Sequence, residues 1–200
     1  LILLVIMTMI GAVSQKDFFT WGIVGNIMYQ MSIPLVISVG LTYVLLLGMA
    51  LVMSARDAVL FLLAWEIMSL APFFLIDFND GDSKVRDASW VYLVAAHLGA
   101  VALIAFFGLL WQSSGVTALD ALRDGAALRA AGPGVMTALF LLAVLGFGAK
   151  AGLAPLHVWL PEAHPAAPSH VSALLSGAMI IAGLYGLIRS LGILAAPGAA

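Results

Sequence analysis

The sequence predicts an all-α membrane protein, a bundle of several transmembrane helices of which one is interrupted. Of the 200 residues, 64% are hydrophobic and only 9% are charged, whereas a soluble domain averages about 45–50% apolar and about 25% charged residues. The apolar runs are continuous and lack the alternation over ~10 residues that marks strands of a membrane barrel. The third observation is a stretch rich in proline, from Gly146 to Ser172, that breaks an apolar segment carrying Lys150.

The beginning of the chain does not divide cleanly into spans. Residues 1–13 are expected to be the end of a helix whose start precedes the sequence, and a polar break follows them. The uncharged stretch from 18 to 55 is too long for one simple span of a ~30 Å hydrocarbon core. Asn26, Gln30 and Pro34 divide it. One solution is an interfacial or partial segment at 18–31 followed by a full span at 34–54.

The later spans are separated by charged or proline-containing connections. The polar connection at 113–133 is expected to hold a short surface helix whose apolar side bears Leu119, Leu122, Ala126 and Leu128. Ser169 is a plausible N-cap for the last helix. The expected elements are a span at 58–77, a wet loop at 79–87, a span at 88–111, a span that starts near 134 and breaks between 155 and 168, and a helix at 169–194.

Composition excludes several classes of function. A formal net charge of −2 argues against nucleic-acid binding, which favours a basic face. The absence of cysteine excludes disulfides, thiolate metal sites and iron–sulfur clusters. No phosphate loop, nucleophile triad or haem motif is present, so no cofactor is expected. Residues 1–200 are expected to form a single membrane domain, the first half of a longer subunit.

Two ionisable residues lie within apolar segments. Glu66, near the middle of its span, costs about 2.5–3.5 kcal/mol to insert, and such residues are usually functional. It is either a titrating relay group or a structural residue, in an ion pair or as a protonated glutamic acid bonded to a neighbouring helix. Lys150 is flanked by glycines, and Pro155 leaves the carbonyl of Ala151 without its helical donor. The lysine is either a switchable proton store beside a broken helix or a static partner of Glu66.

The four histidines have different expected roles. His157 lies inside the break and is the best candidate for a proton relay near neutral pH. His164 and His170 are expected to be loop residues, and the histidines with their intervening prolines fit no standard metal-binding spacing. His97 is either a satisfied core histidine or a relay stop between Glu66 and Lys150.

These residues lie in motifs that resemble a known family. Residues 65–70 (Trp-Glu-Ile-Met-Ser-Leu), 148–161 and 163–169 are similar to the proton-translocating antiporter-like subunits of respiratory complex I, Mrp antiporters and membrane-bound hydrogenases. The sequence Ala-His-Pro-Ala-Ala-Pro-Ser-His-Val-Ser-Ala-Leu-Leu-Ser-Gly is most like the large antiporter-like subunit of hydrogenase-4 and formate hydrogenlyase. The similarity extends over roughly 35–194 and is specific in its second half.

The resemblance implies a bundle of about fourteen helices that contains two inverted repeats, of which this chain would hold the first. It implies that Glu66 on the fifth helix and Lys150 on the seventh form a modulated pair, and that His97 lies on the sixth. It also implies proton, or Na⁺, translocation in a bacterial or archaeal cytoplasmic membrane. The implied partners are other membrane subunits, peripheral redox subunits and lipid.

One position departs from the family pattern. Where the family commonly has a lysine on the eighth helix, this sequence has Ile181, which cannot carry a proton. Water, Ser172, Ser176 or Tyr185 would have to bridge the gap. If none does, this half-channel is impaired, and Ile181 favours the alternative of a structural membrane anchor that has lost transport. A cation/proton antiporter subunit of the Mrp type is the other alternative.

Overall fold

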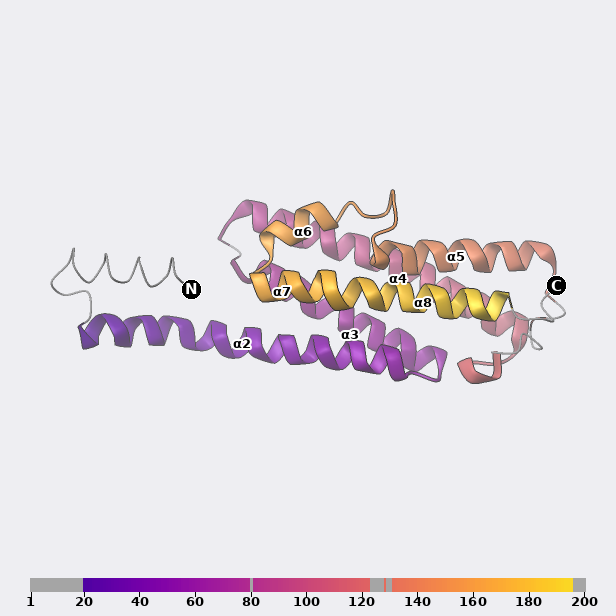
Figure 1. Cartoon of the computed structure of the whole chain (residues 1–200), viewed down its shortest axis with the longest axis horizontal. Helices are drawn as coiled ribbons and strands as arrows, with labels where there is room; N and C mark the ends of the chain where they lie inside the picture. The colour runs from indigo at the N-terminus through magenta and orange to yellow at the C-terminus, as the bar shows by residue number, and fades with distance from the viewer. Residues whose placement is uncertain (1–19, 80, 123–127, 129–130, 196–200) are drawn as a thin grey trace. The chain divides into compact units, whose positions relative to one another are not determined.

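The computed structural model describes residues 20–79, 81–122, 128 and 131–195 (Figure 1). The expected helix end at 1–13 and the break after it lie outside these residues. In the described part of the chain the secondary structure is helical, and the only extended pairing there is an isolated bridge between Asp57 and Ala118. The expected all-α class is confirmed.

Five helical segments among the described residues are long and apolar enough to cross a membrane. They make the chain an integral, multi-pass membrane protein. The last of them contains two α-helices joined by a π-helical turn at Leu175–Met179. The segments are α2 (Trp21–Ser54), α3 (Ala58–Ile76), α4 (Ser83–Ser114), α5 (Pro133–Ala151) and the span that joins α7 (Ser169–Leu174) to α8 (Ile180–Leu194).

Helix α2 is continuous, so the expected division of its sequence into two segments is wrong. Pro34 lies inside the helix, as membrane helices tolerate. Asn26 and Gln30 lie one turn apart on the exposed surface of the helix, where the Gln30 amide donates to Asn26 Oδ1 at 3.2 Å. The chain forms two compact units that divide within α2, one up to Gly40 and one from Leu41 onward.

Aspartates fix where α3 and α4 begin. Asp57 caps α3 by accepting hydrogen bonds from the backbone of Val59 and Leu60 at 2.8 and 3.4 Å. Together with a hydrogen bond from Thr117, these donors hold the pKa of the Asp57 carboxyl below its ordinary value. Asp82 caps α4 in the same way, so the expected wet loop is shorter than 79–87 and its last residues form the first turn of α4.

The connection after α4 packs inward. Its described part contains a 3₁₀ turn at Leu119–Leu122, and Leu119, Leu122 and Leu128 are buried. The expected shared apolar side agrees with the burial of these three leucines, but the described part forms only a short 3₁₀ turn, and Ala126 lies outside it. The backbone of Leu119 donates to Arg56 and that of Ala58 donates to Thr117, which ties this connection to the turn before α3.

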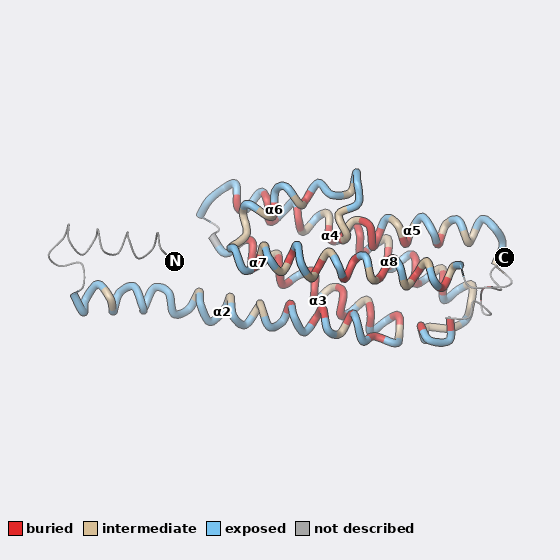
Figure 2. The backbone as a smooth tube through the Cα atoms, viewed as in Figure 1, coloured by how far each residue is buried: buried red, intermediate tan, exposed pale blue. Residues whose placement is uncertain are grey.

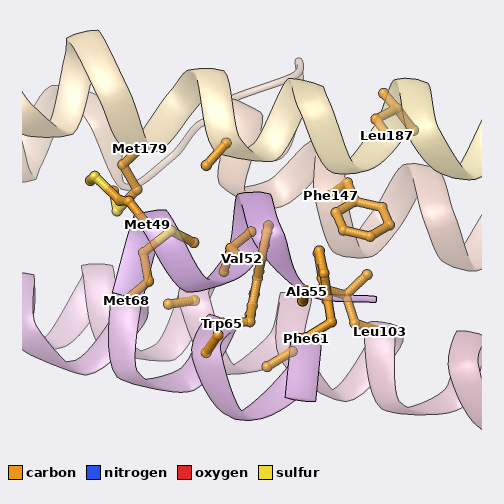
Figure 3. Packing of buried hydrophobic residues seen from close by; sticks show 14 of the residues in the cluster. Met49, Val52, Ala55, Phe61, Trp65, Met68, Leu103, Phe147, Met179 and Leu187 are labelled. Atoms are coloured by element: carbon orange, nitrogen blue, oxygen red, sulfur yellow. The ribbon is translucent and has the colours of Figure 1, made fainter. Parts of the chain in front are cut away.

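An aromatic cluster fills the space between α3, α4 and α5 in the second unit. Buried residues concentrate where these helices and α8 face one another (Figure 2). Trp65 and Phe147 meet edge to face, with ring centroids 5.4 Å apart, and Phe61 contacts both (Figure 3). Each such aromatic pair stabilises the bundle by about 0.5–1.5 kcal/mol beyond the area it buries.

The expected interruption after Lys150 is present, but a glycine causes it. Helix α5 ends at Ala151 because Gly152 adopts a left-handed conformation (φ 70°), and the next amide, from Leu153, donates back to Gly148. A non-helical segment leads to the short helix α6 (Leu160–Ala166). The indole of Trp159 donates to the carbonyl of Ala149 at 2.8 Å, so this orphan carbonyl at the helix end has a partner.

The last span begins without the expected side-chain cap. Ser169 is the first residue of α7, and Pro168, in an extended conformation, occupies the cap position with no side-chain hydrogen bond. Helix α8 then lies against α5 at two glycines. A Cβ atom on Gly183 would fall 2.7 Å from the backbone nitrogen of Ala151, and one on Gly186 would meet the ring of Phe147.

Candidate functional site

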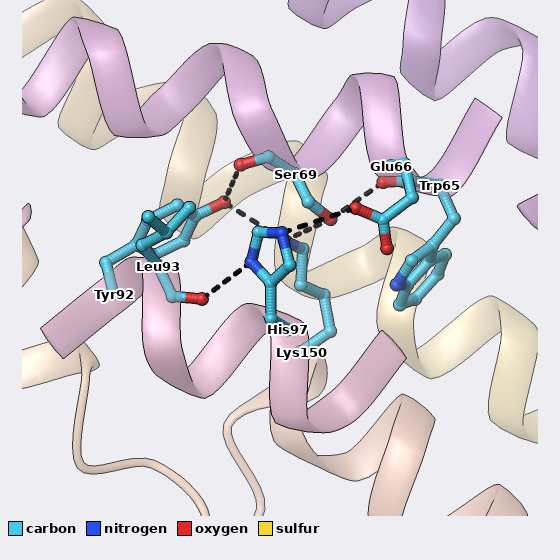
Figure 4. Close-up of polar contacts among 7 residues, drawn as sticks. All are labelled: Trp65, Glu66, Ser69, Tyr92, Leu93, His97 and Lys150. Carbon is cyan, nitrogen blue, oxygen red and sulfur yellow. Dashed lines mark hydrogen bonds and ion pairs between the residues drawn. The ribbon is translucent and has the colours of Figure 1, made fainter. Parts of the chain in front are cut away.

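Lys150 lies in the last turn of α5 and is 3% exposed. Its ammonium group, Nζ, donates to two hydroxyl oxygens, Ser69 Oγ on α3 at 2.9 Å and Tyr92 OH on α4 at 3.0 Å (Figure 4). Three helices therefore meet at one buried cation. An isolated ammonium in hydrocarbon is costly, and these hydrogen bonds are what make its burial tolerable.

Both hydroxyl groups have their own hydrogens engaged elsewhere. Ser69 Oγ donates to the carbonyl of Trp65 at 2.7 Å, and Tyr92 OH donates to the carbonyl of Ser69 at 2.9 Å. Each hydroxyl oxygen consequently presents lone pairs to Lys150. The ammonium also lies 5.0 Å from the centre of the Tyr92 ring, within the range of a cation–π interaction.

Glu66 and His97 form the second part of the site. Their side chains, on α3 and α4, are 34% and 47% exposed, and Oε2 of Glu66 lies 3.8 Å from Nε2 of His97. The other ring nitrogen, Nδ1, lies 2.9 Å from the carbonyl of Leu93. A carbonyl only accepts, so this contact places a hydrogen on Nδ1. Nε2 and the Glu66 carboxyl group, which face each other, are the two atoms of this pair that can take up a further proton.

The structure does not bring Glu66 and Lys150 into direct contact. No ion pair of 4.0 Å or less joins these two described residues, since Glu66 pairs with His97 and Lys150 bonds to the hydroxyls. The group of α3 that Lys150 contacts is Ser69, three residues beyond Glu66 and hence on a neighbouring part of the same helix surface. The two parts of the site are adjacent and each has its own partners.

The histidines of the break lie apart from Lys150. His157 is exposed on the segment between α5 and α6, and no hydrogen bond or ion pair connects its side chain to Lys150 or Glu66 in the described structure. The expectation that His164 and His170 are loop residues is wrong, because they lie in α6 and α7. His164 contacts Ser172 Oγ through Nδ1 at 2.9 Å and stacks near Trp159. Among the described residues, no group of three or more His, Cys, Asp or Glu is arranged to hold a metal ion.

Helix α8 offers no proton carrier to Lys150 within the described residues. Ile181 is 56% exposed. The side chains of Ser172, Ser176 and Tyr185 bond instead to His164, to the backbone of their own helix and to the carbonyl of Met53. What α8 places beside Lys150 is the backbone of Gly183, whose missing side chain lets the helices touch.

Residues 55–199 match the family model described as NADH:quinone oxidoreductase/Mrp antiporter, transmembrane. The chain belongs to this antiporter family. The match includes the helices that carry Glu66, His97 and Lys150, and it confirms the family to which the sequence motifs are similar.

Relatives in the antiporter family include characterised and uncharacterised proteins. An uncharacterised protein of Mycobacterium tuberculosis is 43% identical over 71% of this chain and 21% of its own length. Hydrogenase-4 component B of Escherichia coli is 41% identical over 66% of this chain and 19% of its own length. A chain of the Mrp complex from Dietzia sp. matches in structure with a TM-score of 0.68 and 27% identity, over 80% of this chain and 18% of that one. The chain thus spans about a fifth of the length of the curated relatives it matches.

Sequence reasoning missed Ser69 and Tyr92 as members of this antiporter-family site. Neither side chain carries a charge, so neither stands out in an apolar span, although Ser69 lies in the 65–70 motif that contains Glu66. One signal was available, because Ser69 follows Glu66 by three residues and so shares its side of the helix. Another was that a tyrosine buried in a membrane span needs a partner for its hydroxyl group.

Proposed function

We propose that this chain provides the proton-carrying part of an antiporter-like subunit in a redox-driven membrane complex, such as a membrane-bound hydrogenase or a relative of complex I. In this proposal the transported ion is H⁺, with Na⁺ as a possible second cation. The partners are other membrane subunits, peripheral redox subunits and lipid. The redox energy comes from those partners, because nothing in this sequence holds an electron carrier.

The observation that supports the proposal best is the burial of Lys150 among neutral oxygens. A lysine whose only role was structural would be most stable beside a carboxylate. This one bonds to two hydroxyls while the nearby carboxylate, Glu66, is paired with His97. Lys150 can therefore lose its proton without leaving a buried carboxylate unpaired, and Glu66, His97 and Lys150 supply acid–base groups from three neighbouring helices.

Two other functions have specific support. Ile181, in place of the family's common lysine, favours a structural anchor without transport. The likeness to a chain of the Mrp complex favours a cation/proton antiporter subunit. In either case the site has the same geometry, and transport measurements distinguish the three functions.

The decisive experiment replaces Lys150 with methionine in the full-length subunit within its complex, reconstituted in proteoliposomes. Lys150→Met is expected to abolish proton pumping while assembly and electron transfer persist, because methionine fills the space and cannot hold a proton. The matched control is Lys84→Met, at an exposed position in the first turn of α4, and its pumping should equal that of the unmodified complex. Unchanged pumping in Lys150→Met would support the anchor, and Na⁺-dependent proton movement without redox substrate would support the antiporter.

A further inference from the structure

We propose that Tyr92 is a positioning residue which, with Ser69, holds the Lys150 ammonium away from the Glu66–His97 pair. We call Ser69 Oγ and Tyr92 OH the hydroxyl pair. The inference rests on the proposed function, since it names the groups that decide whether Lys150 or His97 is the side chain that contacts Glu66.

The first argument is the direction of each hydrogen bond. The hydrogen of Ser69 Oγ goes to Trp65 and that of Tyr92 OH goes to the carbonyl of Ser69. Neither hydroxyl can then donate to Lys150, so the hydroxyl pair acts as two acceptors aimed at one point. These two acceptors stabilise the ammonium group at that point. They therefore oppose its movement toward the Glu66 carboxyl group.

The second argument is that Tyr92 is fixed in place and linked to the helix break. Its ring meets the indole of Trp159 edge to face, with centroids 5.4 Å apart. The same indole donates to the carbonyl of Ala149, the residue before Lys150. Tyr92 therefore contacts Lys150 directly through its hydroxyl and indirectly through Trp159, and a change in the break at 152–159 would reach the hydroxyl pair.

The third argument is the distribution of charge around Lys150. From α3 and α4 the nearby charged or titratable groups are Glu66 and His97, and Tyr92 itself. From the last span the neighbours in the described structure are Met179 in the π-helical turn, whose sulfur lies 3.5 Å from Tyr92 OH, and the backbone of Gly183 in α8. Among these neighbours Glu66 is thus the one carboxyl group toward which the Lys150 side chain could move. His97 already lies beside that carboxyl group, with Nε2 3.8 Å from Oε2.

The test measures redox-driven proton pumping by the reconstituted full-length complex carrying single substitutions. Tyr92→Phe keeps the ring and removes one acceptor, and Ser69→Ala removes the other. A hydrogen bond to a charged group contributes enough for its loss to reduce pumping about tenfold in each variant. Ser69→Thr restores a hydroxyl and should restore pumping. Met179→Leu, which alters the other neighbour of Tyr92 OH and leaves the hydroxyl pair intact, is the matched control and should pump normally.

The outcomes separate this inference from the function on which it rests. If Lys150→Met abolishes pumping while Tyr92→Phe and Ser69→Ala pump normally, the positioning role is overturned and the proposed function stands. If Met179→Leu loses as much pumping as Tyr92→Phe, or if Ser69→Thr fails to rescue, general packing explains the effect and the inference is also overturned. Normal pumping in Lys150→Met overturns the proposed function itself.

Discussion

The contact between α5 and α8 at Gly183 gives the sharpest prediction about stability. A Cβ atom at this position would lie 2.7 Å from the nitrogen of Ala151 and 3.0 Å from the carbonyl carbon of Lys150. Both neighbours are backbone atoms, so no side chain can rotate out of the way. Gly183→Ala must separate the two helices by about 0.7 Å to restore ordinary van der Waals contact, which begins near 3.4 Å.

The cost follows from the packing of the surrounding bundle. Inserting a methyl group into a well-packed interior costs about 1–3 kcal/mol, and a rigid backbone on the other side places this substitution at about 2–3 kcal/mol. For a chain of this size that corresponds to a decrease in Tm of about 4–12 °C. Because the displaced atoms belong to Lys150 and Ala151, proton pumping should fall together with stability.

The assay is thermal unfolding of the purified protein in detergent, with Gly192→Ala as the matched control. Gly192 lies on the same helix, and a Cβ atom there would meet nothing within 4 Å. Alanine is the better helix former by up to about 1 kcal/mol, so the Tm of Gly192→Ala should equal or exceed that of the unmodified protein. If Gly183→Ala and Gly192→Ala unfold at the same temperature, the close approach of α8 to α5 described above is incorrect.

Two further predictions concern the start of α3 and the end of α5. The folded state lowers the pKa of Asp57 below 3.8, so its contribution to stability is present above that pH and is lost as the pH falls through the folded value. Thermal unfolding between pH 3 and 7 should show this loss of stability in the unmodified protein. Asp57→Asn, which still caps the helix but does not titrate, should not show it. Asp57→Ala removes the cap and should be less stable at neutral pH. The second prediction is measured by denaturant titration. Trp159→Phe should lower the free energy of unfolding by about 1–3 kcal/mol, because it leaves the Ala149 carbonyl without its donor. The control, Trp111→Phe at an exposed position, should leave the free energy of unfolding unchanged.

The membrane spans could be predicted from sequence wherever a charged residue ends an apolar run. Asp57 and Asp82 are such residues, and α3 begins where the sequence indicates. The continuity of α2 could not be predicted, because Pro34 and the polar side chains near it suggest a break. Membrane helices tolerate an internal proline, so neither Pro34 nor the exposed pair Asn26 and Gln30 decides from sequence alone whether the helix continues.

In the candidate site, too, the sequence predicts which residues matter but not which of them contact one another. Lys150, Glu66 and His97 stand out because charged and titratable groups are rare in apolar segments. Which of them are partners depends on how three helices are rotated about their axes. A rotation of one residue position would exchange Ser69 for a neighbour, so the sequence alone does not distinguish a Glu66–Lys150 pair from the arrangement in Figure 4.

The π-helical turn at Leu175–Met179 determines where the last span can lose a residue. A π-helical turn accommodates one residue more than an α-helical turn, so deleting Gly177 would convert it to regular α-helix and leave Gly183 facing α5. Deleting a residue from a regular α-helical turn of this span would instead change the angular phase of everything that follows by about 100°. The extra residue in this turn therefore makes the loss of one residue more tolerable here than elsewhere in the span.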